Sequence, residues 1–103
     1  MKTFEIKVQM PWNDSTIADT IERVAESHQL VTSLKGTLRK YPGSVHWHFK
    51  RKWKLGTIEA TMWPLEQRVW LSIQRRRFAP WMEETVVRFC RELAANFKLC
   101  GVS

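Results

Sequence analysis

The chain has 103 residues, of which 44% are hydrophobic and 26% are charged, and its formal net charge is +7 at pH 7. These values predict one folded domain over residues 1–103, because domains commonly have about 100–150 residues and disordered chains contain fewer apolar residues. No apolar run reaches the roughly 18–20 residues of a membrane span, and residues 1–10 lack the apolar block of a signal peptide. We therefore expect a cytoplasmic protein.

The first third of the sequence predicts one strand and one helix. Alternating polar and apolar residues predict a strand over residues 3–10, which Pro11 ends. Apolar residues at helical spacing then predict a helix that begins at the N-cap Asn13 and ends at the C-cap Gly36. Residues 38–44 contain a Pro-Gly pair and are expected to form a loop.

The rest of the chain predicts three strands and a second helix. The strands are expected at about 45–53, 57–63 and 68–76, and the short turns between them predict an antiparallel meander. Pro80 suits the first turn of a helix, for which Gly101 is a plausible end. One apolar stripe of this helix comprises Met82, Val86, Phe89, Leu93 and Phe97.

This element order predicts an α/β (α+β) fold. The expected architecture is a two-layer sandwich of topology βαβββα, in which a mainly antiparallel four-stranded sheet carries both helices on one face. The first strand can lie beside the second strand or beside the fourth, and the sequence does not choose between them. The opposite face of the sheet is then left for solvent or for a partner.

The alternation of residues along the three later strands predicts which side chains lie on this open face. They are His46, His48, Lys50, Lys52, Thr57, Glu59, Thr61, Trp63, Arg68, Trp70, Ser72 and Gln74. Pairing Trp53 with Gly56 places Lys50 opposite Glu59, His48 opposite Thr61 and His46 opposite Trp63. Pairing Trp63 with Arg68 likewise places Thr61 opposite Trp70.

Aromatic and basic side chains on one sheet face are typical of surfaces that bind single-stranded nucleic acid, where bases stack on rings and cations contact phosphates. Trp63 and Trp70 are the candidate stacking residues. The same two side chains can instead anchor a homodimer or a protein partner, or can simply cover their neighbours.

Positive charge is concentrated in the middle of the chain. Residues 35–77 contain eleven Lys and Arg and only two Asp and Glu. Two clusters lie at strand ends that an antiparallel meander brings to one edge of the sheet; they are Lys50, Arg51, Lys52 and Lys54, and Arg75, Arg76 and Arg77. Such clustering favours a polyanion, although it can also serve solubility alone.

Enzymatic motifs are not evident in the sequence. His46 and His48 have a spacing that can hold a metal, but a third ligand is needed, and the residues expected opposite them, Thr61 and Trp63, are unsuitable. Cys90 and Cys100 do not form a metal-binding motif, and we expect two ordinary thiols. No cofactor, metal site or catalytic residue is predicted.

The leading hypothesis is therefore a non-enzymatic module that binds nucleic acid, either RNA or a single strand. Its candidate binding residues are Lys50, Arg51, Lys52, Lys54, Trp63, Arg68, Trp70, Arg75, Arg76 and Arg77. The alternative is a homodimerising or protein-interaction domain that uses the same sheet face. Docking to an anionic membrane is disfavoured, because the basic and aromatic residues lie on strands rather than on an amphipathic helix.

Overall fold

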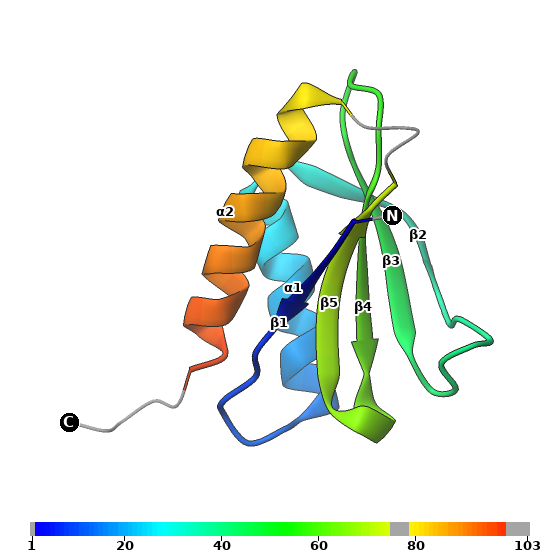
Figure 1. Ribbon diagram of the computed structural model, residues 1–103, viewed down its shortest axis with the longest axis vertical. Helices are drawn as coiled ribbons and strands as arrows, with labels where there is room; N and C mark the ends of the chain where they lie inside the picture. Colours follow the sequence, from blue (N-terminus) through cyan, green and yellow to red (C-terminus); the bar gives the residue numbers. More distant parts are fainter. Residues whose placement is uncertain (1, 75–78, 99–103) are drawn as a thin grey trace.

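The fold is α+β, with one antiparallel sheet of five strands and two helices on one of its faces (Figure 1). It is seen in a computed structural model that describes residues 2–74 and 79–98. The elements in chain order are β1 (Lys2–Ile6), α1 (Asp14–Ser27), β2 (Leu30–Gly36), β3 (Val45–Arg51), β4 (Ile58–Trp63), the 3-10 helix η1 (Pro64–Glu66), β5 (Arg68–Ile73) and α2 (Pro80–Asn96). The strands lie in the order β1-β5-β4-β3-β2.

β2 is a strand that the sequence analysis missed. Helix α1 begins at the predicted N-cap, where Oδ1 of Asn13 accepts a hydrogen bond from the backbone N–H of Thr16. The helix ends at Ser27 rather than near Gly36, and Gln29 then has a left-handed backbone with φ of 63°. Gly36 is the last residue of β2 and not a helix cap.

The misassignment of β2 has a physical cause. Val31 and Leu34 continue the helical spacing of α1, but both side chains are exposed and neither packs in the core. What holds this segment is backbone pairing with β3, with a register irregularity between Thr32 and Leu34. Because this pairing depends on residues far along the chain, a local pattern cannot reveal it.

β1 is shorter than predicted and lies beside β5, which settles the position that the sequence left open. The strand ends at Ile6 instead of continuing to Met10. The backbone N–H groups of Gln9 and Met10 both donate to the carbonyl of Phe97, at 2.7 and 3.0 Å. The segment after β1 therefore leaves the sheet and contacts the end of α2.

Helix α2 begins at Pro80, as predicted, and all five residues of its predicted apolar stripe are fully buried. It ends at Asn96 with Phe97 as C-cap, and the backbone N–H of Phe97 donates to the carbonyl of Leu93. The predicted end at Gly101 is therefore too late, and Gly101 itself lies outside the described residues.

The register between β4 and β5 is the predicted one, whereas that between β3 and β4 is shifted by two residues. Trp63 pairs with Arg68, as expected. On the other side of β4, however, His48 pairs with Glu59 rather than with Thr61. The cause is the connection: β3 ends at Arg51, and six residues, 52–57, join it to β4 in place of the tight turn that was expected.

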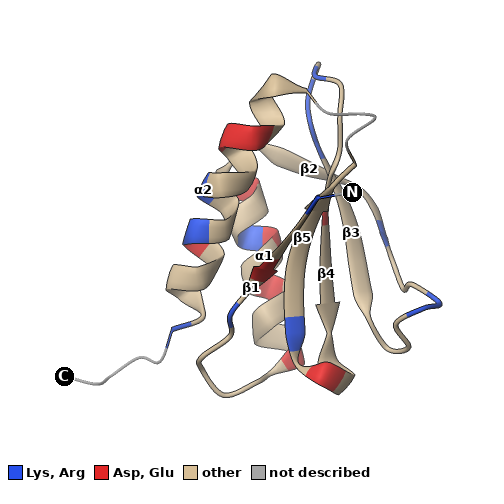
Figure 2. Cartoon of the chain, viewed as in Figure 1, with Lys and Arg blue, Asp and Glu red and all other residues tan. Residues whose placement is uncertain are grey.

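The core lies between the sheet and the helices. The side chains of β3, β4 and β5 that alternate with the predicted open-face residues, among them Trp47, Ile58 and Leu71, are buried against the two helices, apart from Val45, which is partly buried. Most acidic residues lie on the helices and at the ends of the sheet, and lysines and arginines mark the β3–β4 connection and the loop before β3 (Figure 2). Among the described residues, neither helix is both long and apolar enough to cross a membrane.

Candidate functional site: a histidine and carboxylate cluster beside a basic hairpin

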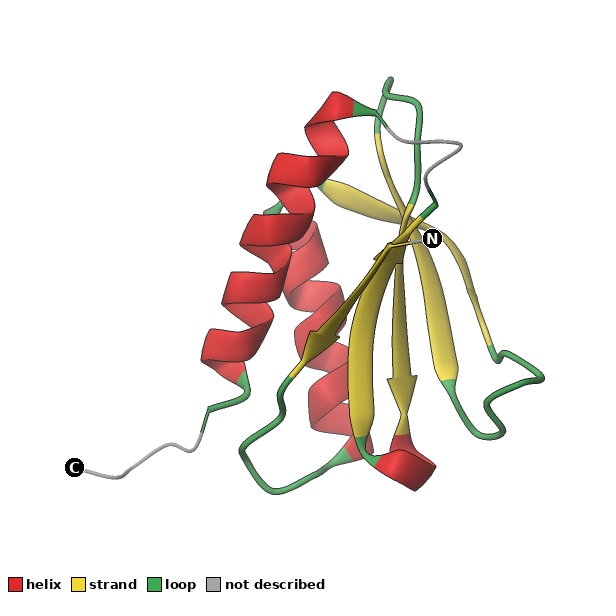
Figure 3. Cartoon of the chain, viewed as in Figure 1, coloured by secondary structure: helices red, strands yellow, loops and turns green. Residues whose placement is uncertain are grey.

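The loop between β2 and β3, residues 37–44, covers part of the sheet face that lies away from the helices (Figure 3). The ring of Tyr41 packs edge-on against Trp63 and Trp70, with centroid distances of 4.9 and 5.0 Å. Nε1 of Trp63 also donates to the carbonyl of Pro42 at 3.0 Å. As a result Trp70 is only 7% exposed, so the expectation that it is displayed to solvent is wrong.

The loop and the sheet enclose a pocket of about 290 Å³. Four polar residues of the sheet line it; they are His46, Glu59, Thr61 and Ser72. Lys40, Tyr41, Arg68 and Trp70 also line it. A hollow of about 60 Å³ shares Glu59 with this pocket and is also lined by His48, Thr57 and Gln74. Glu59 thus belongs to both cavities.

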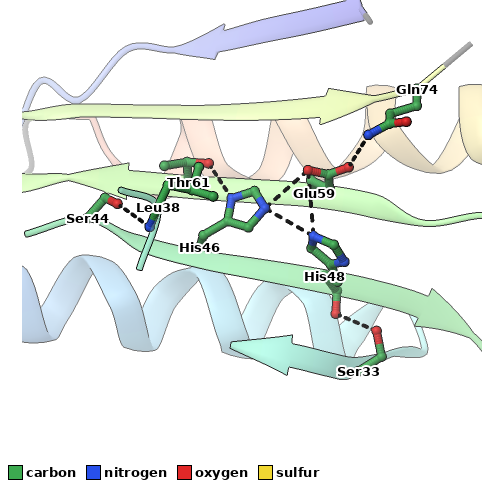
Figure 4. Close-up of polar contacts among 8 residues, drawn as sticks. All are labelled: Ser33, Leu38, Ser44, His46, His48, Glu59, Thr61 and Gln74. Atoms are coloured by element: carbon green, nitrogen blue, oxygen red, sulfur yellow. Dashed lines mark hydrogen bonds and ion pairs between the residues drawn. The ribbon is translucent and has the colours of Figure 1, made fainter. Parts of the chain in front are cut away.

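Three groups that can bind a metal meet at this point (Figure 4). His46 and His48 lie on β3, and Glu59 lies on β4 as the direct partner of His48. Oε1 of Glu59 lies 3.1 Å from Nε2 of His46 and 3.7 Å from Nε2 of His48. The two Nε2 atoms are 3.2 Å apart. The two-residue register shift brings these groups together and supplies the third ligand that the sequence analysis could not place.

Neighbouring polar groups hold the cluster in position. Nδ1 of His46 lies 2.8 Å from the hydroxyl oxygen of Thr61, which is fully buried. Nε2 of Gln74 donates to Oε2 of Glu59 at 3.5 Å. The hydrogen bond with His46 is the main cause that lowers the pKa of Glu59, with smaller contributions from His48 and Gln74, and burial partly opposes it. Glu59 is therefore an ionised carboxylate at neutral pH.

The β3–β4 hairpin carries the first predicted basic cluster, with Lys50 and Arg51 at the end of β3 and Lys52 and Lys54 in the connection to β4. Lys50, Lys52 and Lys54 are exposed, and between them Trp53 is 92% exposed. Nζ of Lys52 lies 5.7 Å from the centre of the Trp53 ring. Trp53 was predicted to end a strand, and its exposure was missed. The signal was present in the sequence, because an aromatic residue flanked by lysines is a common arrangement for binding nucleic acid.

Arg51 differs from its neighbours, because it contacts the rest of the protein. Its guanidinium lies 4.9 Å from the centre of the Trp81 ring and donates to the carbonyl of His28 at 3.0 Å. Nε1 of Trp81 in turn donates to the carbonyl of Leu55 at 2.7 Å. Arg51 and Trp81 thus attach the hairpin to the helical layer, so that the lysines project from a fixed base.

The remaining predicted binding residues are placed as follows. Arg68 makes a bidentate ion pair with Glu5, in which Nη2 and Nε donate to the two carboxylate oxygens at 2.8 and 3.1 Å. Its guanidinium lies 4.8 Å from the centre of the Trp70 ring. Arg75, Arg76 and Arg77 lie outside the described residues. Since β3 and β5 are both antiparallel to β4, their C-terminal ends lie at the same end of the sheet.

Cys90 has a free thiol that is partly buried on α2. Burial raises its pKa to about 11. Because the thiolate is the reactive form, this thiol is a poor nucleophile at neutral pH.

No protein-family model matches the chain, and neither a curated protein nor a solved structure shows significant similarity.

Proposed function

We propose that this protein binds single-stranded nucleic acid, with RNA as the first candidate, through the tip of its β3–β4 hairpin. The observation that carries the proposal is the exposed ring of Trp53 among Lys50, Lys52 and Lys54. A nucleic-acid base can stack on such a ring while the surrounding ammonium groups contact phosphates. The attachment of the hairpin to Trp81 supports it further, because a fixed binding loop loses less entropy on binding.

Two features of the open sheet face modify the role assigned to it from the sequence. Trp70 is covered by Tyr41, and Arg68 is paired with Glu5, so we do not assign either residue as a main contact for nucleic acid. Trp63 is partly exposed and remains a candidate contact beyond the hairpin. The alternative of self-association through this face draws less support for the same reason, because one of its two proposed anchors is buried.

The test measures anisotropy of a fluorescently labelled single-stranded RNA across a range of salt concentrations. The hairpin variant replaces Lys50, Lys52 and Lys54 by Glu. The control variant makes the same change in net charge elsewhere, by replacing Lys7, Arg23 and Arg91 by Glu. These residues are exposed and lie after β1, on α1 and on α2 rather than on the hairpin. Because each lost phosphate contact on a single strand reduces the salt slope of binding by about 0.7 unit, we expect a reduction of roughly two units in the hairpin variant and none in the control.

Three outcomes decide the proposal. Loss of binding in the hairpin variant but not in the control supports it. Failure of the unmodified protein to bind RNA at low salt contradicts it, and so does an equal loss in both variants. Sedimentation at several protein concentrations shows whether a stable dimer forms instead.

A further inference from the structure

We propose that His46, His48 and Glu59 bind one zinc ion on the open face of the sheet, with a coordination position left open toward the pocket under Tyr41. This site lies on the strands and not on the exposed hairpin tip. The inference therefore does not depend on nucleic-acid binding.

The distances between the three ligand atoms match those around a zinc ion. Zinc bonds to imidazole nitrogen and carboxylate oxygen are about 2.0–2.2 Å long, so neighbouring ligand atoms in a tetrahedral site lie about 3.3–3.6 Å apart. The observed separations are 3.1, 3.2 and 3.7 Å between Nε2 of His46, Nε2 of His48 and Oε1 of Glu59. An ion fits this triangle with shifts of a few tenths of an ångström.

The backbone explains why the triangle is already assembled. His46 and His48 are two residues apart on β3, so both imidazoles lie on the same side of the sheet. Glu59 is the direct partner of His48 on the adjacent strand. Regular strand pairing thus holds all three ligands, and no loop has to close to complete the site.

The contacts around the ligands are those that commonly orient metal ligands. When Nδ1 of His46 donates its proton to the hydroxyl oxygen of Thr61, Nε2 keeps its lone pair for the ion. The second carboxylate oxygen of Glu59 accepts a hydrogen bond from Gln74. One oxygen therefore remains to face the two histidines.

The chemistry of the ligand set favours zinc. Two imidazoles and one carboxylate suit a divalent transition metal better than magnesium or calcium, which prefer oxygen ligands. Three protein ligands leave a fourth tetrahedral position for water or another small ligand, which is the arrangement of zinc sites that bind a reactant. His46 and Glu59 both line the 290 Å³ pocket, so this position is accessible. Lys40, which also lines the pocket, favours an anionic ligand there.

The experiment titrates the metal-free full-length chain with zinc chloride in a calorimeter and, separately, with cobalt(II). We expect one zinc ion per chain. Four-coordinate cobalt should give visible d–d absorption without a thiolate charge-transfer band, because no cysteine takes part. His48→Gln and Glu59→Gln should each weaken zinc binding by at least about 100-fold, since even changing the residues around metal ligands commonly costs about 10- to 100-fold.

The matched control is His28→Gln, which removes the one histidine outside the cluster. His28 lies at the end of α1, where it contacts Glu92 and the ring of Phe89. Its replacement should leave zinc affinity unchanged. Should a ligand variant fail to fold, NMR of the unmodified chain decides: zinc should shift the ring resonances of His46 and His48 and leave those of His28 in place.

The inference is overturned if the unmodified chain does not bind zinc, or if His48→Gln binds it as tightly. It is also overturned if cobalt shows thiolate bands, or if zinc shifts the resonances of His28 rather than those of the pair on β3.

Discussion

The ring of Tyr41, in the loop before β3, packs edge-on against the ring of Trp70 on β5 with 5.0 Å between their centroids. The same tyrosine ring contacts Trp63, at 4.9 Å. These contacts place the loop over the sheet face that the two helices leave uncovered. They turn a flat surface into a pocket, and they decide which aromatic side chains can meet a ligand.

We therefore expect Tyr41→Ala to expose Trp70 and to destabilise the fold. Aromatic pairs contribute about 0.5–1.5 kcal/mol each beyond the area that they bury, so losing two should lower the free energy of unfolding by about 1–3 kcal/mol. Urea denaturation measures this loss, and acrylamide quenching of tryptophan fluorescence should increase. Tyr41→Phe keeps the ring and should preserve both values. Equal stability and equal quenching in the alanine variant would show that the loop does not protect the sheet face.

Trp53 should act in binding and not in folding. Its ring is 92% exposed, so Trp53→Ala should change the free energy of unfolding by less than about 0.5 kcal/mol. If a base stacks on the ring, RNA affinity should fall by about 1–3 kcal/mol, as measured by anisotropy.

The matched control for Trp53 is Leu55→Ala in the same hairpin. The Leu55 side chain is 88% exposed and offers no aromatic ring, so its loss should leave RNA affinity unchanged. An equal loss of affinity in the two variants would indicate general apolar contact rather than stacking.

Glu22 on α1 contacts Lys35 and Trp47 of the sheet, and we expect this contact to weaken at acidic pH. Hydrogen bonds from Lys35 first and then from Trp47, at 2.7 and 2.9 Å, lower the pKa of this carboxyl below its ordinary value of 4.5. A carboxyl whose pKa is lowered in the folded state contributes its full stabilisation at pH values above its ordinary pKa. This stabilisation is lost as the pH falls through the pKa of the folded state.

Glu22→Gln should therefore lose less stability between neutral and acidic pH than the unmodified protein. At pH 7 it should be less stable by about 0.5–1 kcal/mol, because the contact is partly exposed. Urea denaturation at a series of pH values measures both effects. Lys35→Gln should likewise reduce the fall in the free energy of unfolding between neutral and acidic pH. Parallel stability curves for Glu22→Gln and the unmodified chain would show that this contact does not control acid stability.

Much of the fold could be predicted from local pattern. The apolar stripe of α2 and, apart from the partly buried Val45, the inward residues of β3, β4 and β5 are buried as expected, because helical and strand periodicities specify faces directly. The turn between Trp63 and Arg68 also has the predicted register. Each of these features depends on residues close together in the sequence.

The features that assemble the candidate site depend on tertiary structure. A two-residue slip leaves every side chain on the same face, so the alternating pattern of β3 and β4 fits either partner for His48. The six-residue connection and the attachment of the hairpin to Trp81 accompany the observed register, in which Glu59 meets His48.

The sequence by itself determined that the chain is basic and that its positive charge is concentrated in residues 35–77. Tertiary structure alone decided that 30–36 form a strand, because its backbone partners lie on β3. It also decided that Trp70 is covered, because Tyr41 reaches it only after the chain has turned back over the sheet. Periodicity reports which face a residue occupies, whereas register and coverage depend on contacts between distant segments.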